Sequence, residues 1–210
     1  MDTPSAIVTT FTAVFDVMQI PVPTSQNIRA TIGLPLSTAF SNLLGLPAHD
    51  KRVDVSVELY QRFYRELIVP QARELLFPGV AAGLSFLREQ GFALAIATSK
   101  FQASADLLLR QAELGNQFDL VIGADQVNHP KPHPESGSLI LNRLGFSNDQ
   151  AVMVGDTIHD LLMAKASGMD SIAVTYGIHS YEILKSQQPT WIAHSFDEVI
   201  SYLKGQGGLS

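Results

Sequence analysis

The sequence predicts an α/β protein in which a doubly wound parallel sheet follows a lobe made only of helices. From residue 77 onward, short apolar runs alternate with segments of helical periodicity, which is typical of a parallel sheet covered on both faces. Before residue 77, apolar residues recur at helical spacing and no strand pattern is found. We therefore expect two domains, a helical lobe at residues 1–76 and an α/β core at residues 77–210.

Composition and charge limit the classes of function. The chain has 210 residues, of which 46% are apolar and 16% charged, so it is able to bury a core. A formal net charge of −6 argues against a nucleic-acid polymer as the main partner. It does not exclude a small anionic substrate, because a few local cations suffice to bind one.

The chain contains no cysteine, which excludes disulfides, thiol nucleophiles and thiolate metal sites. A bound metal would have to take oxygen or imidazole ligands. No apolar run has the length of a membrane span, and the N-terminus lacks the basic region of a signal peptide. We therefore expect no membrane partner and a cytoplasmic location.

Within the lobe, apolar residues at helical spacing predict a first helix at residues 5–18. Pro21 and Pro23 interrupt the helical pattern after it, and Ser25 is placed to cap the next turn. Further helical patterns cover residues 36–45 and 53–67.

In the α/β core, each apolar run is followed by a helical segment. The first helix of this region ends at Gly91, a residue suited to the position after a helix, and Gly168 closes a later helix. The predicted runs cover residues 93–98, 118–125, 151–156, 171–177 and 190–195. The predicted helices cover residues 80–90, 102–114, 136–144, 159–167 and 196–204.

Three consecutive strand ends carry polar residues. Thr98 and Ser99 end the first run, Lys131 lies in the loop after the second, and Asp156 ends the third with Asp160 four residues on. Ligands of such sheets bind beyond the carboxyl ends of the strands. A hydroxyl and an ammonium group hold phosphate oxygens, and a carboxylate pair suits Mg²⁺. Together these groups are the parts of a phosphoryl-transfer site.

Each of these signals has a simpler interpretation when taken alone. Gly-Asp after a strand is often a turn, Thr98 is placed to cap the following helix, and Lys131 is an ordinary loop lysine. Prolines on both sides stiffen the loop around Lys131, which favours a specific task for it. His129 and His133 are four residues apart, but the prolines between them exclude a helix, so we expect loop residues and not a metal site.

With these residues in this order, the sequence resembles the haloacid-dehalogenase superfamily of phosphatases, in particular its phosphoglycolate-phosphatase-like group with a helical cap. The resemblance covers nearly the whole chain. Residues 93–100, ALAIATSK, resemble the second family motif; residues 129–135, HPKPHPE, the third; and residues 152–160, VMVGDTIHD, the fourth. Residues 28–36 resemble the cap loop that faces the substrate, and residues 77–80, FPGV, the hinge between cap and core.

The resemblance implies a role for each strand-end residue. Thr98 and Ser99 would bind phosphate, and Lys131 would neutralise its charge. Asp156 would be the Mg²⁺ ligand, with Asp160 as a second carboxylate that supports either the metal or the lysine.

In the cap loop, Arg29 and Gly33 are candidates to meet the substrate, although a solvated helix arginine is the simpler interpretation of Arg29. The substrate implied is a small phosphorylated metabolite: phosphoglycolate, a sugar phosphate or a nucleoside monophosphate. The protein would be a monomer or a homodimer.

This sequence differs from the family pattern at the first motif. That motif is a strand that ends in Asp-x-Asp-Gly-Thr and supplies the nucleophile and the general acid/base, and this sequence contains no such stretch. Residues 1–15 resemble the segment that follows it. Loss of this central strand would leave its two neighbours with unpaired backbone groups, which cost about 1–3 kcal/mol each if buried. We therefore expect an N-terminal truncation, with a catalytically inactive phosphate-binding protein as the alternative.

The function predicted from the sequence is thus that of a Mg²⁺-dependent phosphomonoester hydrolase acting through a phosphoaspartate. A phosphomutase of the same superfamily is a further alternative, since it would use the same intermediate.

Overall fold

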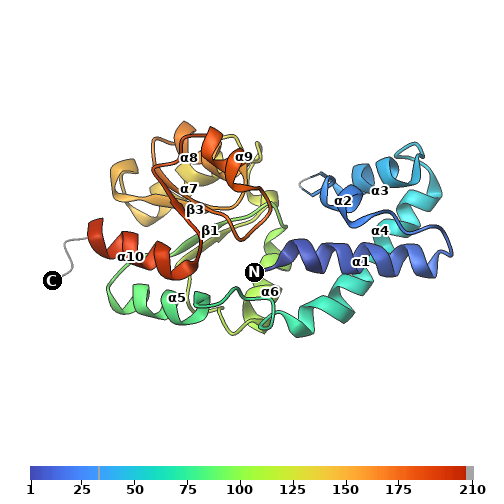
Figure 1. Ribbon diagram of the computed structural model, residues 1–210, viewed down its shortest axis with the longest axis horizontal. Coiled ribbons are helices and arrows are strands. Elements are labelled where there is room, and N and C mark those ends of the chain that lie inside the picture. The colour runs from blue at the N-terminus through green and yellow to red at the C-terminus, as the bar shows by residue number, and fades with distance from the viewer. Residues whose placement is uncertain (33, 207–210) are drawn as a thin grey trace. The chain divides into compact units, whose positions relative to one another are not determined.

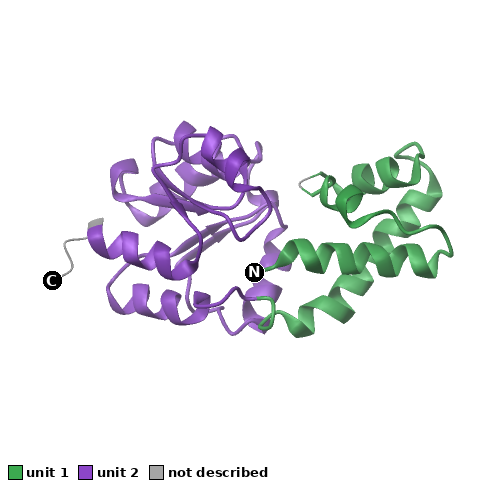
Figure 2. Ribbon diagram, viewed as in Figure 1, with its two compact units in different colours: residues 1–75 green, residues 76–210 purple. Residues whose placement is uncertain are grey.

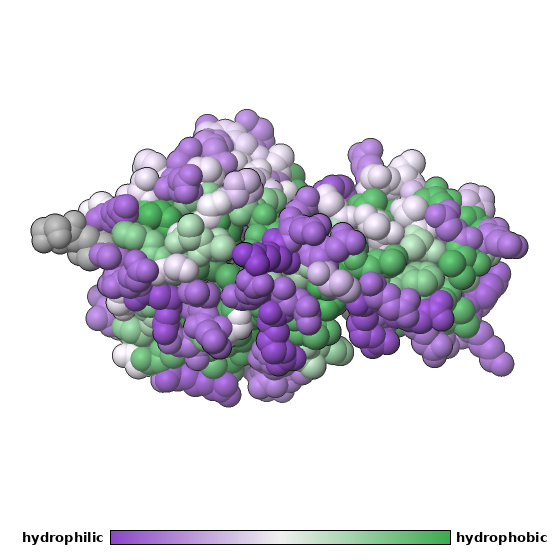
Figure 3. Space-filling view, turned by 90° about the horizontal axis from the view of Figure 1, so that it is seen from below, coloured by the Kyte–Doolittle hydropathy of each residue, from purple (hydrophilic) through white to green (hydrophobic). Residues whose placement is uncertain are grey.

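The computed structural model describes residues 1–32 and 34–206, and the chain divides into two compact units, Met1–Leu75 and Leu76–Ser210 (Figures 1 and 2). Over the described residues, no helix combines the length and apolar character needed to cross a membrane. Hydrophilic and hydrophobic residues are interspersed on both units over the face shown in Figure 3.

The first unit contains only helices among its described residues. They are α1 (Thr3–Val17), α2 (Ser25–Arg29), α3 (Leu36–Leu44), α4 (Lys51–Phe63), the π-helical turn η1 (Tyr64–Ile68) and the 3₁₀ turn η2 (Val69–Gln71). Asp2 caps α1, because its Oδ1 accepts a hydrogen bond from Ser5 N at 3.2 Å.

Two details of the first unit differ from the sequence prediction. Thr24 and not Ser25 caps α2, since its hydroxyl accepts from Asn27 N at 3.2 Å and Ser25 is the first helical residue. The helix expected at 53–67 changes into the π-helical turn at Tyr64. The reason is Pro70, which has no backbone N–H and whose ring clashes with the carbonyl four residues earlier in a regular α-helix.

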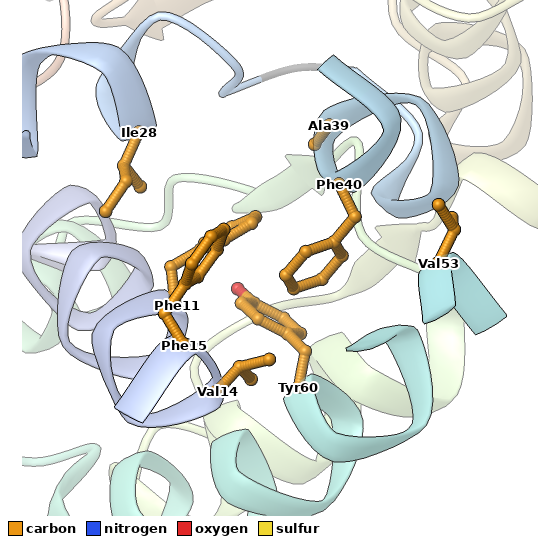
Figure 4. Packing of buried hydrophobic residues seen from close by; sticks show 8 residues of the cluster. All are labelled: Phe11, Val14, Phe15, Ile28, Ala39, Phe40, Val53 and Tyr60. Atoms are coloured by element: carbon orange, nitrogen blue, oxygen red, sulfur yellow. The ribbon is translucent and has the colours of Figure 1, made fainter. Parts of the chain in front are cut away.

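Aromatic side chains from three helices form the core of this unit (Figure 4). The ring of Phe11 lies 4.5 Å from that of Phe40 and 5.0 Å from that of Tyr60, measured between centroids. The side chains of Phe11 and Phe40 are at most 2% exposed. Truncation of a phenylalanine buried in this way costs about 3–5 kcal/mol, so this cluster fixes α1, α3 and α4 against one another.

The second unit alternates strands and helices, as predicted for an α/β fold. Its strands are β1 (Ala95–Ala97), β2 (Leu120–Ile122), β3 (Val152–Gly155), β4 (Asp170–Val174) and β5 (Trp191–Ala193). Its helices are α5 (Val80–Glu89), α6 (Gln102–Gln111), η3 (Ala124–Gln126), α7 (Glu135–Leu144), η4 (Asn148–Gln150), α8 (Ile158–Ala166), α9 (Tyr181–Ser186) and α10 (Phe196–Gln206).

Among the described residues of this unit, all strand pairs are parallel, and they form two sheets with the orders β1-β2 and β3-β4-β5. Ile122, Ile172 and Ala193 on these strands are almost completely buried, which explains why the sequence shows continuous apolar runs. No strand within the described residues joins β1 to β3.

The backbone of β1 has two edges with different partners. Leu94 O accepts from Asp119 N at 2.8 Å and Thr98 N donates to Ile122 O at 3.0 Å, so these residues face β2. Since successive residues of a strand alternate in direction, the backbone groups of Ala95 and Ala97 face the other edge. That edge is where the candidate site begins.

Candidate functional site

Lys131 and Asp160 form a buried ion pair at the carboxyl end of β1. The Lys131 Nζ lies 2.7 Å from Asp160 Oδ1 and donates to the carbonyl of Ala97 at 3.0 Å. The two side chains are only 12% and 6% exposed. Lys131 is therefore not a solvated loop lysine, and its ammonium group reaches the edge of β1 that faces away from β2.

Asp160 is held by the start of α8 as well. Its Oδ2 accepts from the backbone N of Thr157 at 3.1 Å and from the hydroxyl of Thr157 at 2.7 Å. A Cβ added to Gly155 would lie 2.3 Å from the Cβ of Asp160, so only glycine fits at the end of β3. The charge of Asp160 is thus already paired with the Lys131 ammonium, which favours support of the lysine over direct metal binding.

Asp156 directly follows β3 and is partly buried. Its Oδ2 accepts from Ile178 N at 3.0 Å, and a Cβ added to Gly177 would lie 2.1 Å from that oxygen. Burial and, second, the negative charge of Asp160 raise the pKa of Asp156 above its ordinary value. A carboxylate in such surroundings is stabilised by a cation, which is the property expected of a metal ligand.

Thr98 and Ser99 lie in the turn between β1 and α6. The hydroxyl oxygen of Thr98 accepts from Lys100 N at 3.1 Å, and Ser99 is exposed. Helix α6 begins at Gln102, whose N–H donates to Asp125 Oδ1 at 2.7 Å. Asp125 therefore caps α6 from the neighbouring strand end, and the interpretation of Thr98 as the helix cap is wrong.

The structure thus brings Lys131 and Asp160 into contact. Asp156 follows β3, the strand before α8, and Thr98 follows Ala97. The two cap-loop candidates come from the first unit, residues 1–75. Arg29 lies in the first unit, where its guanidinium donates to Ser5 Oγ at 3.4 Å. Gly33 lies outside the described residues.

The loop after β4 also contributes to the site, although the sequence reasoning did not include it. Its backbone binds Asp156 through Ile178, and His179 Nδ1 accepts from the backbone N of Ile158 at the start of α8 at 3.0 Å. Burial and the charge of Asp156 raise the pKa of Tyr176 in this loop to about 12. The apolar run at 171–177 ends in the polar residues Thr175 and Tyr176, and this strand end would have indicated the loop.

Comparison with known proteins shows the family to which the chain belongs. The family model described as haloacid dehalogenase-like hydrolase matches residues 1–174. "Probable phosphatase IndB" of Dickeya dadantii (strain 3937) is 52% identical over 200 residues, which cover 95% of this chain and 87% of that protein.

Two further matches are more distant. The phosphoglycolate phosphatase of Salmonella typhi is 34% identical over 158 residues, and the match covers 75% of this chain but only 62% of that relative's length. A solved haloacid dehalogenase-like family hydrolase of Streptococcus pneumoniae is similar with a TM-score of 0.79 and 27% identity, covering 96% of this chain and 92% of that one. The chain therefore belongs to the haloacid dehalogenase-like hydrolase family and is a phosphatase by its resemblance to that family's members.

Proposed function

We propose that this chain forms the phosphate- and metal-binding part of a Mg²⁺-dependent phosphomonoester hydrolase that acts on a small phosphorylated metabolite. The observation that carries the proposal is the buried pair of Lys131 and Asp160 at the edge of β1. Burying a lysine beside a carboxylate costs desolvation energy. Such buried charges are typical of functional sites, and a lysine here can bind an anion.

Lys131 and Thr98 would hold the phosphoryl group. The ammonium group has three hydrogens, and two of them point to Ala97 O and Asp160 Oδ1, which leaves one for a phosphate oxygen. The Thr98 oxygen accepts from Lys100 N, so its own hydrogen is available to a second phosphate oxygen. Asp160 acts through the lysine as a positioning residue.

Asp156 would be the direct Mg²⁺ ligand. Mg²⁺ in proteins is commonly bound by one or two carboxylates, with waters and substrate phosphate oxygens completing the shell. Asp156 fits this role because its carboxylate is desolvated and lies near a second negative charge. When bound, the ion supplies charge neutralisation at the phosphoryl group.

The attacking carboxylate would come from a strand between β1 and β3, as in the first motif of the family. The two separate sheets support this proposal, because β1 and β3 each have one ladder partner among the described residues. Such a strand would end beside Ala97, Lys131 and Asp156. The helical unit would serve as the cap that closes over the leaving group.

The relatives named as phosphoglycolate phosphatases support a small substrate of that kind, with sugar phosphates and nucleoside monophosphates as alternatives. We propose a cytoplasmic monomer or homodimer. The test is a substrate panel on the chain extended at its N-terminus by a family-type strand ending in Asp-x-Asp-Gly-Thr, with inorganic phosphate release measured at fixed Mg²⁺.

We expect release of phosphate that is abolished by Asp156→Asn. Transfer of the phosphate to a sugar monophosphate, giving a bisphosphate, would instead indicate a phosphomutase. Saturable phosphate binding without turnover of any panel member would indicate a catalytically inactive binding protein.

A further inference from the structure

A second group of potential ligands lies in the loop before α7 and at the first residue of that helix, on either side of Lys131. His129, His133 and Glu135 each offer a ligand atom, and these atoms all lie within 4.8 Å of one another. Within residues 1–32 and 34–206 this is the one place where three or more such ligands meet. His129 and His133 are 65% and 49% exposed, so an ion from solution can reach them.

The loop is ordered by bonds to Glu135. One carboxylate oxygen accepts from Asn128 N at 2.8 Å, and the other accepts from His129 N at 2.9 Å. The second oxygen also lies 2.8 Å from His129 Nδ1. The hydrogen bond from the Asn128 backbone and, second, the one from the His129 side chain lower the pKa of Glu135 below its ordinary value.

The two imidazoles lie side by side. Their ring centroids are 4.5 Å apart, and His133 Nδ1 is 4.0 Å from the Glu135 carboxylate. Prolines at 130, 132 and 134 restrict the backbone, so little conformational entropy remains to be lost when an ion binds.

Two imidazoles and one carboxylate are a ligand set for Zn²⁺ and similar transition metals, whereas Mg²⁺ prefers oxygen ligands alone. Tetrahedral Zn²⁺ with bonds of about 2.0–2.1 Å needs ligand atoms about 3.3 Å apart. The observed separations of 2.8 and 4.0 Å lie on either side of that value. Closing the site requires rotation of the two rings, at the expense of the 3.2 Å hydrogen bond from Glu135 N to His133 Nδ1.

We propose that His129, His133 and Glu135 form a binding site for a divalent transition-metal ion of the Zn²⁺ class, separate from the carboxylate of Asp156. The ligands converge in the same conformation of the loop that pairs Lys131 with Asp160. An ion bound here therefore stabilises that conformation, because a ligand shifts an equilibrium toward the state that it binds best.

The test uses the full chain after treatment with a chelator and removal of the chelator. Zn²⁺ is titrated by calorimetry, with Mg²⁺ present in excess to occupy carboxylate sites. We expect one saturable equivalent whose affinity falls at least about tenfold in His129→Ala, in His133→Ala and in Glu135→Gln. The glutamine variant removes the charge and has one acceptor oxygen, so it retains only one of the two backbone bonds, and the fold check is needed to separate a ligand role from loop disorder.

His159→Ala and Asp156→Asn are the matched controls, and both should retain the affinity of the parent. His159 is an exposed histidine on α8, and Asp156 is the carboxylate of the other site. Equal affinity in the parent and in all three loop variants, or loss of binding only in Asp156→Asn, would overturn the proposal. A fold check by circular dichroism accompanies each variant, and Zn²⁺ should raise the melting temperature of the parent but not of His133→Ala.

Discussion

At the scale of single residues, the site depends on two opposite charges, Lys131 and Asp160, that are both largely buried. Lys131 and Asp160 are exposed by only 12% and 6%, so each is the main compensation for the charge of the other. Removing one partner of such a pair is far more destructive than removing a surface ion pair. This makes stability a readout of the site that is independent of turnover.

Lys131→Met should destabilise the chain by about 3–5 kcal/mol, because it leaves the Asp160 carboxylate buried without its cation. Adding Asp160→Asn should recover a substantial part of that loss, since the amide is neutral and its oxygen still accepts from Thr157. Urea unfolding of the parent, both single variants and the double variant gives the coupling energy. A coupling energy close to zero would mean that the pair contributes no more than surface charges do.

The raised pKa of Asp156 predicts that the free energy of unfolding of the metal-free protein depends on pH. Above the ordinary value of 3.8 the unfolded chain releases this proton, while the folded chain retains it up to a higher pH. The contribution of Asp156 to stability is therefore fully present at low pH and is lost as pH rises through its folded pKa. Asp156→Asn removes this dependence.

In the presence of a chelator, Asp156→Asn should gain stability relative to the parent as pH rises from 3.8 to neutrality. Added Mg²⁺ should then stabilise the parent and not the variant. Urea unfolding across this pH range is the measurement. If the difference in free energy of unfolding between parent and variant does not change with pH, burial of the Asp156 charge does not destabilise the protein.

At the scale of elements, the connection between β3 and α8 fixes the positions of Asp156 and Asp160.

The sequence predicted most strands and helices, because buried parallel strands and amphipathic helices have distinct periodicities. It placed the strand bounds too wide, since the apolar runs continue into turns, and it missed the π-helical turn at Tyr64. Such a turn depends on how a helix adjusts before Pro70, which periodicity does not encode.

Gly155→Ala tests the connection between β3 and α8. The new Cβ would meet the Cβ of Asp160 at 2.3 Å, an atom that cannot rotate away, so the strand end or the first turn of α8 must move. We expect a loss of about 1–3 kcal/mol by overpacking, measured by thermal or urea unfolding. Gly205→Ala is the matched control, because nothing lies within 4 Å of its added Cβ and alanine favours the helix. Equal effects of the two substitutions would mean that the close approach of Asp160 to Gly155 does not constrain this position.

At the scale of the whole molecule, the strand-end rule identified residues from different segments that the structure brings together. Thr98, Lys131 and Asp156 were found because each carries a reactive side chain after an apolar run. The backbone N–H of Ile178, which binds Asp156, carries no such signal. The approach of His129 and His133 to Glu135 was not foreseen either, because it is made by backbone hydrogen bonds within an irregular loop.

The division into two sheets leads to the last prediction. A strand inserted between β1 and β3 would give both of them a second ladder partner and join the sheets β1-β2 and β3-β4-β5 into one. Each new hydrogen bond contributes about 0.5–1.5 kcal/mol net, so several of them should raise the free energy of unfolding measurably. Amides at the facing edges of β1 and β3 should gain protection from hydrogen exchange.

Two N-terminal extensions separate the contribution of the strand from that of the nucleophile. One ends in Asp-x-Asp-Gly-Thr, and the other carries asparagine in place of its first aspartate. Both should increase stability and hydrogen-exchange protection equally, because the strand is the same. Only the first should release phosphate, since asparagine cannot attack phosphorus, and that release should disappear with Asp156→Asn. Extensions that change neither protection nor stability would mean that no strand fits between the sheets, and the nucleophile would then have to come from another part of the chain.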